Sequence, residues 1–165
     1  MNLLIRFPTS LIASIAVIMG IPAIAYGSLQ MALQASPDIV YTTHGDKKIE
    51  WAKLSEANSF TEYMGLDKKF DEETLTADIL VLRSYHEPQS SLYEHERVSY
   101  SSMIIHQTIN CRNRSVTVQD VLLFSKFLSK GRLVKDLYDL DYEIGEARAG
   151  TIDEKKVSEL CSFTA

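Results

Sequence analysis

The sequence predicts a mainly β domain of the α+β class, with a short C-terminal helix that a disulfide ties to a sheet. Residues 102–111 alternate between apolar and polar side chains, which is the pattern of a strand with one buried face. Residues 79–82 are all apolar, as in a central strand that is covered on both faces. Thr151 and Glu154 have the spacing of a capping box, which marks the beginning of a helix.

Residues 1–25 are predicted to be an export signal. A basic residue is followed by an apolar run at 11–24, which is shorter than the roughly 17–25 residues that span a bilayer as a helix. Small residues near the end of the run predict cleavage after Ala25. A cut near Ala35 and an uncleaved membrane anchor are the alternatives. No cysteine is present there to carry a lipid, so we expect no lipid anchor through an N-terminal cysteine.

The rest of the chain has the size of one compact domain. We expect a partly ordered lead-in at 26–47 and the β domain at 48–165. The full chain has a net charge of −5 and no cluster of Lys and Arg, whereas proteins that bind nucleic acid need such clusters to displace counterions. Nucleic acid is therefore not an expected partner. The mature protein should be periplasmic, secreted or at the cell surface, without a membrane span.

Alternating and β-branched patterns predict the remaining strands and the connections between them. The expected strands are 39–43, which would be an edge strand, 49–55, 60–64, 75–85, 102–111, 115–127 and 132–137. Trp51, the only tryptophan, is expected to anchor the core. Residues 67–73 should form a charged turn and residues 86–101 a polar connection. The acidic stretch at 136–146 should be a solvated face rather than a calcium site.

Cys111 and Cys161 are the only two cysteines, and one pair in an exported chain predicts a disulfide between them. Cys111 ends the alternating strand on its apolar face. Cys161 lies on the apolar side of the predicted helix, together with Val157 and Leu160. Because such a short helix is marginal in water, a bond to the sheet would hold it in place. Two free thiols are the alternative.

The order of elements over residues 49–162 resembles the surface-adhesin protein E family of Gram-negative bacteria. The resemblance rests on Trp51 in the first strand, the strand at 77–82, the alternating strand that ends in Cys111, and the helix that ends at Cys161. It implies two antiparallel sheets, with the helix tied to a sheet face by the disulfide. It also implies binding of host matrix proteins at the bacterial surface and a self-associated form linked to haem, so a homodimer is one expected state.

The polar connection at 86–101 is the best candidate for a contact surface, because tyrosine and serine are favoured in binding surfaces. The candidate ligand-contact residues are Tyr85, His86, Tyr93, His95 and Tyr100. His86 and His95 could instead hold a divalent metal with nearby glutamates, but their spacing matches no established metal motif. We therefore expect no metal and no cofactor, and we expect His106 to be an ordinary half-exposed strand histidine.

Motifs of the common enzyme classes are missing from the sequence, which has no Gly-x-Ser-x-Gly, no His-Glu-x-x-His and no glycine-rich phosphate loop. The first hypothesis is therefore a non-enzymatic, exported binding protein. It would present sheet edges and the 86–101 connection to a macromolecular partner, which by resemblance is a host matrix protein. The second hypothesis is a periplasmic domain that binds haem or a metal on the sheet face near the helix. A hydrolytic enzyme with an unrecognised site is the third.

Overall fold

The computed structural model describes residues 39–44 and 46–162. The predicted export signal, its cleavage site and most of the lead-in lie outside the described residues. The described elements are β1 (Ile39–His44), β2 (Lys47–Glu56), β3 (Phe60–Gly65), β4 (Lys69–Asp71), β5 (Thr76–Tyr93), β6 (Glu96–Asn110), β7 (Ser115–Phe124), β8 (Leu133–Leu137), β9 (Tyr142–Glu146) and α2 (Ile152–Cys161). Within this part of the chain, no helix is long and apolar enough to cross a bilayer.

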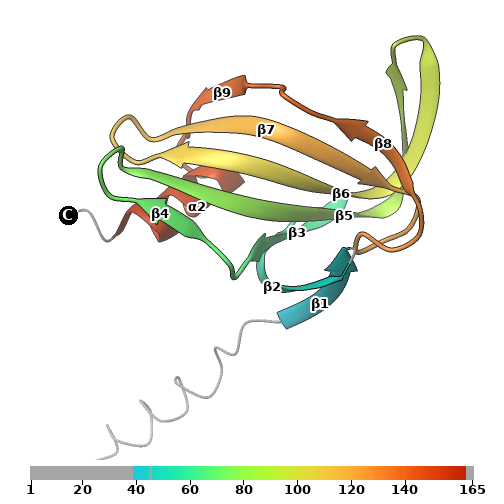
Figure 1. Cartoon of the computed structure of the whole chain (residues 1–165), viewed down its shortest axis with the longest axis horizontal. Coiled ribbons are helices and arrows are strands. Elements are labelled where there is room, and N and C mark those ends of the chain that lie inside the picture. Colours follow the sequence, from blue (N-terminus) through green and yellow to red (C-terminus); the bar gives the residue numbers. More distant parts are fainter. Residues whose placement is uncertain (1–38, 45, 163–165) are drawn as a thin grey trace, which may run out of the picture. The chain divides into compact units, whose positions relative to one another are not determined.

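The described strands form one antiparallel sheet in the order β1-β2-β3-β5-β6-β7-β8 (Figure 1). β3 and β4 pair with different parts of the same edge of β5. In the same way, β8 pairs with the C-terminal part of β7 and β9 with its N-terminal part. The predicted fold class is confirmed, and the predicted central strand is the first half of β5. Hydrogen bonds join the strands into a single open sheet, whereas the resemblance implied two sheets.

One face of the sheet, called the helix face below, is covered by α2. The central strands contribute alternate apolar side chains to it, and the helix contributes Val157 and Leu160. The other buried members of this core are Met64, Ala77, Ile79, Val81, Ile105, Ile109 and Val116. Cys111 follows directly after β6 and is bonded to Cys161 at the end of α2. The predicted disulfide is therefore confirmed, and it closes the end of the helix-face core.

The opposite face of the sheet is covered because the sheet curls back on itself. Trp51 of β2 is fully buried there, in one cluster with Leu82, Ile104 and Phe124 of β5, β6 and β7. The ring of His44 in β1 contacts the ring of Phe124 with centroids 5.9 Å apart. Register shifts in five strand pairs mark bulges or irregularities, which increase the local twist and favour this curl. A single curled sheet thus forms a second core without a second sheet, and Trp51 is its predicted anchor.

The prediction of a polar connection at 86–101 is wrong, because β5 and β6 continue through it and meet at the turn Glu94–His95. Serine, glutamate and histidine hold most of the exposed positions here, and a register shift between Ser84 and Gln89 interrupts the alternation. Both features conceal the period of two. The other predicted strands are present, with ends that differ by a few residues. Strands β4 and β9 were not predicted, because each is a short segment ordered by a longer neighbour.

The helix α2 begins at the predicted capping box. Thr151 is the N-cap, and its hydroxyl accepts a hydrogen bond from the backbone N–H of Glu154 at 3.2 Å. Asp153 and Glu154 lie in the first turn, where negative charge interacts favourably with the helix dipole. With only ten residues, α2 depends on its contacts with the sheet for most of its stability.

A group of charged side chains, called the buried charge cluster below, joins α2 to the helix face. Glu62 of β3 and Lys156 of α2 are both inaccessible to solvent, with Oε1 and Nζ 3.3 Å apart in an ion pair that lacks hydrogen-bond geometry. Arg83 of β5 donates two hydrogen bonds to Glu62 Oε2, at 2.8 and 2.6 Å. Lys156 donates to Gln107 of β6 at 2.9 Å and pairs with Asp153 at 2.7 Å. Burial lowers the pKa of Arg83, but the charge and the hydrogen bonds of Glu62 outweigh burial and raise it overall.

Candidate protein-binding surface

The stretch from the end of β8 through β9 lies at the open edge of the sheet. These residues, 136–146, are called the acidic edge below. The Leu140 N–H donates to the Gln119 carbonyl at 2.9 Å, and the Asp139 N–H donates to the Asp120 carboxylate at 3.3 Å. The segment between the two strands is thereby fastened to β7. Within the described chain β9 pairs with β7 alone, so its other side is an edge that a further strand can join.

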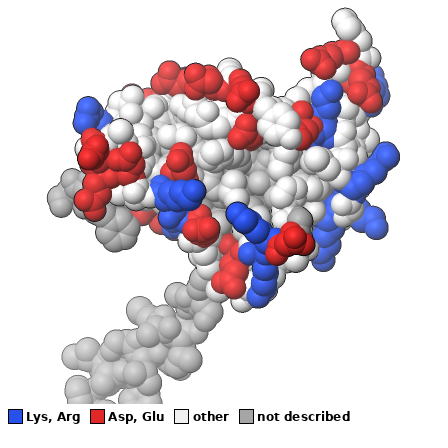
Figure 2. All heavy atoms as spheres, viewed as in Figure 1, with Lys and Arg blue, Asp and Glu red and all other residues white. Residues whose placement is uncertain are grey.

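Large apolar side chains of the acidic edge face solvent. Tyr138 and Tyr142 are 66% and 65% exposed, and Leu140 and Ile144 are 40% and 46% exposed. The carboxylates of this edge are those of Asp136, Asp139, Asp141, Glu143 and Glu146. Figure 2 shows Asp and Glu along the upper margin, where Figure 1 places β9. The Tyr138 hydroxyl donates to Asp136, and this bond raises the pKa of Tyr138. Several large apolar side chains exposed within one short segment are typical of an interaction surface.

The β5–β6 hairpin, residues 85–100, projects beyond the rest of the sheet (Figure 1). Glu94 and His95 form its turn with φ of +47° and +71°, the left-handed conformation that a two-residue hairpin turn of the primed type requires. Leu92 is 67% exposed on the outward face, opposite Arg97 in the strand register. At the tip, Glu94 Oε2 lies 3.5 Å from Nζ of Lys135 in β8. The hairpin and the acidic edge are therefore neighbouring surfaces.

The three predicted contact tyrosines lie on the inner face of the hairpin. Tyr100 is buried, and Tyr85 and Tyr93 are partly buried against a core that includes Leu123 of β7. The Tyr85 ring contacts the rings of Phe60 and Tyr100 at centroid distances of 6.0 and 5.8 Å. These aromatic contacts support the hairpin from beneath. The solvent-exposed face of the hairpin is formed by other residues of the two strands.

The two predicted contact histidines lie at opposite ends of the hairpin. His86 is at the base, with Nε2 3.2 Å from Thr61 Oγ1 and Nδ1 3.1 Å from the Asn58 carbonyl oxygen. His95 is exposed in the turn. Among residues 39–44 and 46–162, no three His, Cys, Asp or Glu side chains gather closely enough to hold a metal ion. The structure therefore does not bring His86 and His95 together as a metal site.

His106 lies on the sheet face opposite Met103 and Ile105, in a hollow of about 210 Å³ that Tyr138 also lines. Its Nδ1 lies 3.2 Å from the Asp120 carboxylate, and about a third of the side chain is exposed. This is the half-exposed strand position expected for it. Binding of haem stays a prediction, which a titration with hemin followed by the Soret band would test.

Tyr85 titrates abnormally because of its place beneath the hairpin. Burial raises its pKa, the positive charge of Arg83 opposes the rise, and Tyr100 adds to it. Burial likewise raises the pKa of Tyr93. Because the folded-state pKa of Tyr85 exceeds its unfolded value, the neutral phenol contributes stability below the ordinary tyrosine pKa of about 10. That contribution is lost as the pH rises through the raised pKa.

We expect the absorbance titration at 295 nm, recorded for the wild type minus Tyr85→Phe, to have a midpoint above the ordinary value of about 10. The free energy of unfolding of the wild type should also fall more steeply between pH 9 and pH 11 than that of the variant. Urea unfolding at the two pH values measures this difference. A difference titration centred at or below pH 10 would contradict the burial of this hydroxyl.

Sequence reasoning did not identify the acidic edge as a candidate surface. A usable signal was present, because residues 138–144 alternate between a large apolar residue and a carboxylate. That alternation is typical of a strand with one buried face. In the structure residues 138–141 form no strand, and the four apolar side chains of this edge segment stay 40–66% exposed. Only the position of β9 in the sheet order distinguishes the two cases.

Comparison with known proteins gives one match. The family model described as "Surface-adhesin protein E" matches residues 51–162, which is more than half of the chain. The matched range begins at the buried tryptophan of β2 and ends just after α2, so it includes both cores and the disulfide. No curated protein and no solved structure matches the chain.

Proposed function

Because this chain belongs to the surface-adhesin protein E family, we propose that it is an exported surface protein that binds a host matrix protein through the acidic edge. The observation that carries the proposal is the exposure of Tyr138, Leu140, Tyr142 and Ile144 along an edge of the sheet that no further described strand extends. Tyrosine supplies a large contact area with a polar tip and is enriched among the residues that dominate binding energies.

The partner surface expected here is a basic, extended segment. A peptide strand can add to β9 through main-chain hydrogen bonds, and some of its side chains would then lie beside Tyr142. The carboxylates of the acidic edge favour Lys and Arg in that segment and disfavour an acidic one. The tip of the hairpin contacts Lys135, next to this edge, so Leu92 and Arg97 near the tip can extend the contact area.

Replacing Tyr138 and Tyr142 together by serine should weaken binding to immobilised laminin or vitronectin about tenfold or more, as loss of two exposed anchors predicts. Both side chains are exposed, so the free energy of unfolding should change by less than about 0.5 kcal/mol. Surface plasmon resonance at two salt concentrations measures the affinity, which should fall with added salt.

The matched control is Leu92→Ser with Arg97→Ser, which changes two exposed residues on the hairpin. A smaller loss of affinity in this control than in the double tyrosine variant supports the acidic edge as the main contact. The reverse order would assign the contact to the hairpin. No binding above an unrelated acidic protein would remove matrix proteins as partners. Sedimentation of both variants shows whether the acidic edge instead joins two copies of the chain.

A further inference from the structure

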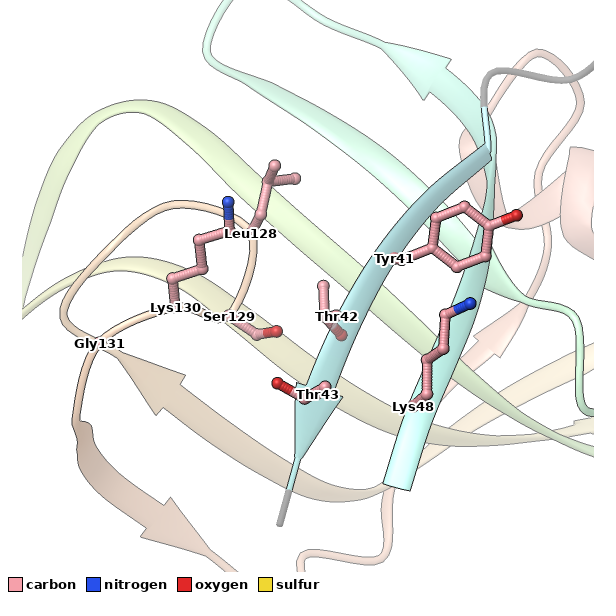
Figure 3. Close-up of a pocket in the computed structure, with 8 residues that line it drawn as sticks. All are labelled: Tyr41, Thr42, Thr43, Lys48, Leu128, Ser129, Lys130 and Gly131. Carbon is pink, nitrogen blue, oxygen red and sulfur yellow. The ribbon is translucent and has the colours of Figure 1, made fainter. Parts of the chain in front are cut away.

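A second surface, separate from the acidic edge and the hairpin, contains a pocket of about 400 Å³. The pocket lies between β1 and the connection from β7 to β8 (Figure 3). Tyr41, Thr42 and Thr43 line it from β1, Lys48 lines it from β2, and residues 128–131 line it from the connection. The lining residues include three hydroxyl-bearing Ser and Thr side chains and two lysines but no carboxylate.

The backbone of the connection is held in an unusual conformation. Leu128 and Ser129 have φ of +54° and +51°, which costs non-glycine residues of the order of 1 kcal/mol each. Ser84 Oγ accepts the Leu128 N–H at 3.2 Å, and Ser102 Oγ accepts the Ser129 N–H at 2.8 Å. Ser102 also donates to the Lys126 carbonyl at 2.6 Å. Ser84 and Ser102, which lie on the central strands, therefore hold the backbone around Ser129 in place.

Ser129 carries an unsatisfied hydroxyl. The residue is 7% exposed, and its Oγ has no hydrogen-bond partner in the described part of the chain. Leaving a buried hydroxyl unpaired costs roughly 1–3 kcal/mol. Figure 3 shows this hydroxyl directed from the connection toward Thr42 and Thr43. Thr42 Oγ1 accepts a hydrogen bond from Trp51 Nε1 at 2.8 Å, which leaves the Thr42 proton available for an acceptor in the pocket.

The charge around the pocket is opposite to that of the whole chain. Lys48 and Lys130 line it, and the neighbouring positions carry Lys47, Lys126 and Arg132. Figure 2 shows Lys and Arg gathered at the lower right of the view, where Figure 1 places the β7–β8 connection.

The Lys48 ammonium lies 3.9 Å from the centroid of the half-exposed Tyr41 ring, which helps to position it at the rim. The Lys48 ammonium also lies 3.7 Å from the carboxylate of Glu50. This ion pair is exposed to solvent, so Glu50 would compete only weakly with a bound anion for Lys48. The ammonium is therefore only partly engaged and remains available at the rim of the pocket.

We propose that this pocket binds an oxyanion, a sulfate or carboxylate group, that is carried by an acidic saccharide chain. The hydroxyl of Ser129 and those of the two threonines donate hydrogen bonds to the anion, and Lys130 supplies the compensating charge. Charge-assisted hydrogen bonds of this kind are among the strongest in proteins. The basic side chains outside the pocket extend the positive surface beyond one anionic group, which favours a polyanionic chain over a free ion.

The test is a calorimetric titration of the full chain with a sulfated tetrasaccharide at low salt, with inorganic sulfate as the second probe. Ser129→Ala and Lys130→Gln should each weaken binding of the tetrasaccharide about five- to tenfold, as loss of one hydrogen bond to a charged group predicts. Lys69→Gln, an exposed lysine on β4 with the same change in charge, is the control and should bind within about twofold of the wild type.

Stability separates a binding role of Ser129 from a structural one. Because its hydroxyl is unpaired, Ser129→Ala should leave the free energy of unfolding unchanged or raise it. A loss of stability in this variant would overturn the assignment of the hydroxyl to a ligand. Equal affinities for Ser129→Ala, Lys69→Gln and the wild type would mean that the saccharide binds through general surface charge. That result would overturn the site. Sulfate that binds as tightly as the tetrasaccharide would overturn the saccharide as its source.

Discussion

Replacing Cys111 and Cys161 together by alanine is expected to lower the free energy of unfolding by about 4 kcal/mol. The two cysteines are 50 positions apart, and closing a loop of that length removes about that much freedom from the unfolded chain in the chain-entropy account. Domains of this size have net stabilities of roughly 5–15 kcal/mol, so the loss is a large share of the total. Urea unfolding followed by circular dichroism measures the difference.

The reduced wild type is the matched control, since it lacks the bond but keeps both sulfur atoms. A reductant should shift the unfolding midpoint of the wild type toward that of the alanine variant and should leave the variant itself unchanged. The effect should be concentrated in α2, because the released helix is too short to persist alone. A midpoint of the wild type that does not respond to a reductant would contradict a stabilising role of this bond.

Replacing Glu62 by glutamine is expected to destabilise the domain by about 3 kcal/mol or more. Glu62 lies between Arg83 and Lys156, so its neutral isostere leaves both cations without their shared partner. Removing one member of a buried ion pair typically costs about 3–5 kcal/mol, because the remaining charge stays desolvated. Lys156 keeps its contacts with Asp153 and Gln107, so we expect a loss of stability at the lower end of that range.

The control for Glu62→Gln is Glu56→Gln, which neutralises an exposed carboxylate on β2. Glu56 pairs with Lys53 at 2.6 Å at the surface, and such exposed pairs contribute little to stability. A double variant, Glu62→Leu with Lys156→Met, should recover much of the loss, since apolar replacement of both partners removes the uncompensated charge. Equal effects of Glu62→Gln and Glu56→Gln would show that the buried charge cluster contributes no more than a surface pair.

The parts of the fold that the sequence predicts correctly are those in which one local pattern decides the outcome. The alternation that ends at Cys111, the apolar run in β5 and the capping box at Thr151 each depend on neighbouring residues alone. The disulfide also follows from local information, because only two cysteines exist to be paired. These features fix the centre of the sheet and the docking of the helix.

The features that sequence reasoning does not reach depend on contacts between distant segments. The hairpin at 85–100 is a strand pair whose inner tyrosines pack on β7, and its exposed serines give no apolar alternation. Glu62, Arg83 and Lys156 read as ordinary surface charges until the topology brings three elements together. The acidic edge and the Ser129 pocket likewise depend on which strand lies at an edge and on what lies across from it.

The meeting of β1 with the end of β7 has a consequence for the rate at which the domain assembles. His44 and Phe124 are far apart in the sequence, so we expect their ring contact to form after the strands between them have paired. Domains dominated by such distant pairings fold on the scale of milliseconds to seconds, because chain closure must precede the gain from contact. If this contact forms late, we expect Trp51 and its neighbours to be exposed to solvent until then, because they lie in the cluster that Phe124 completes.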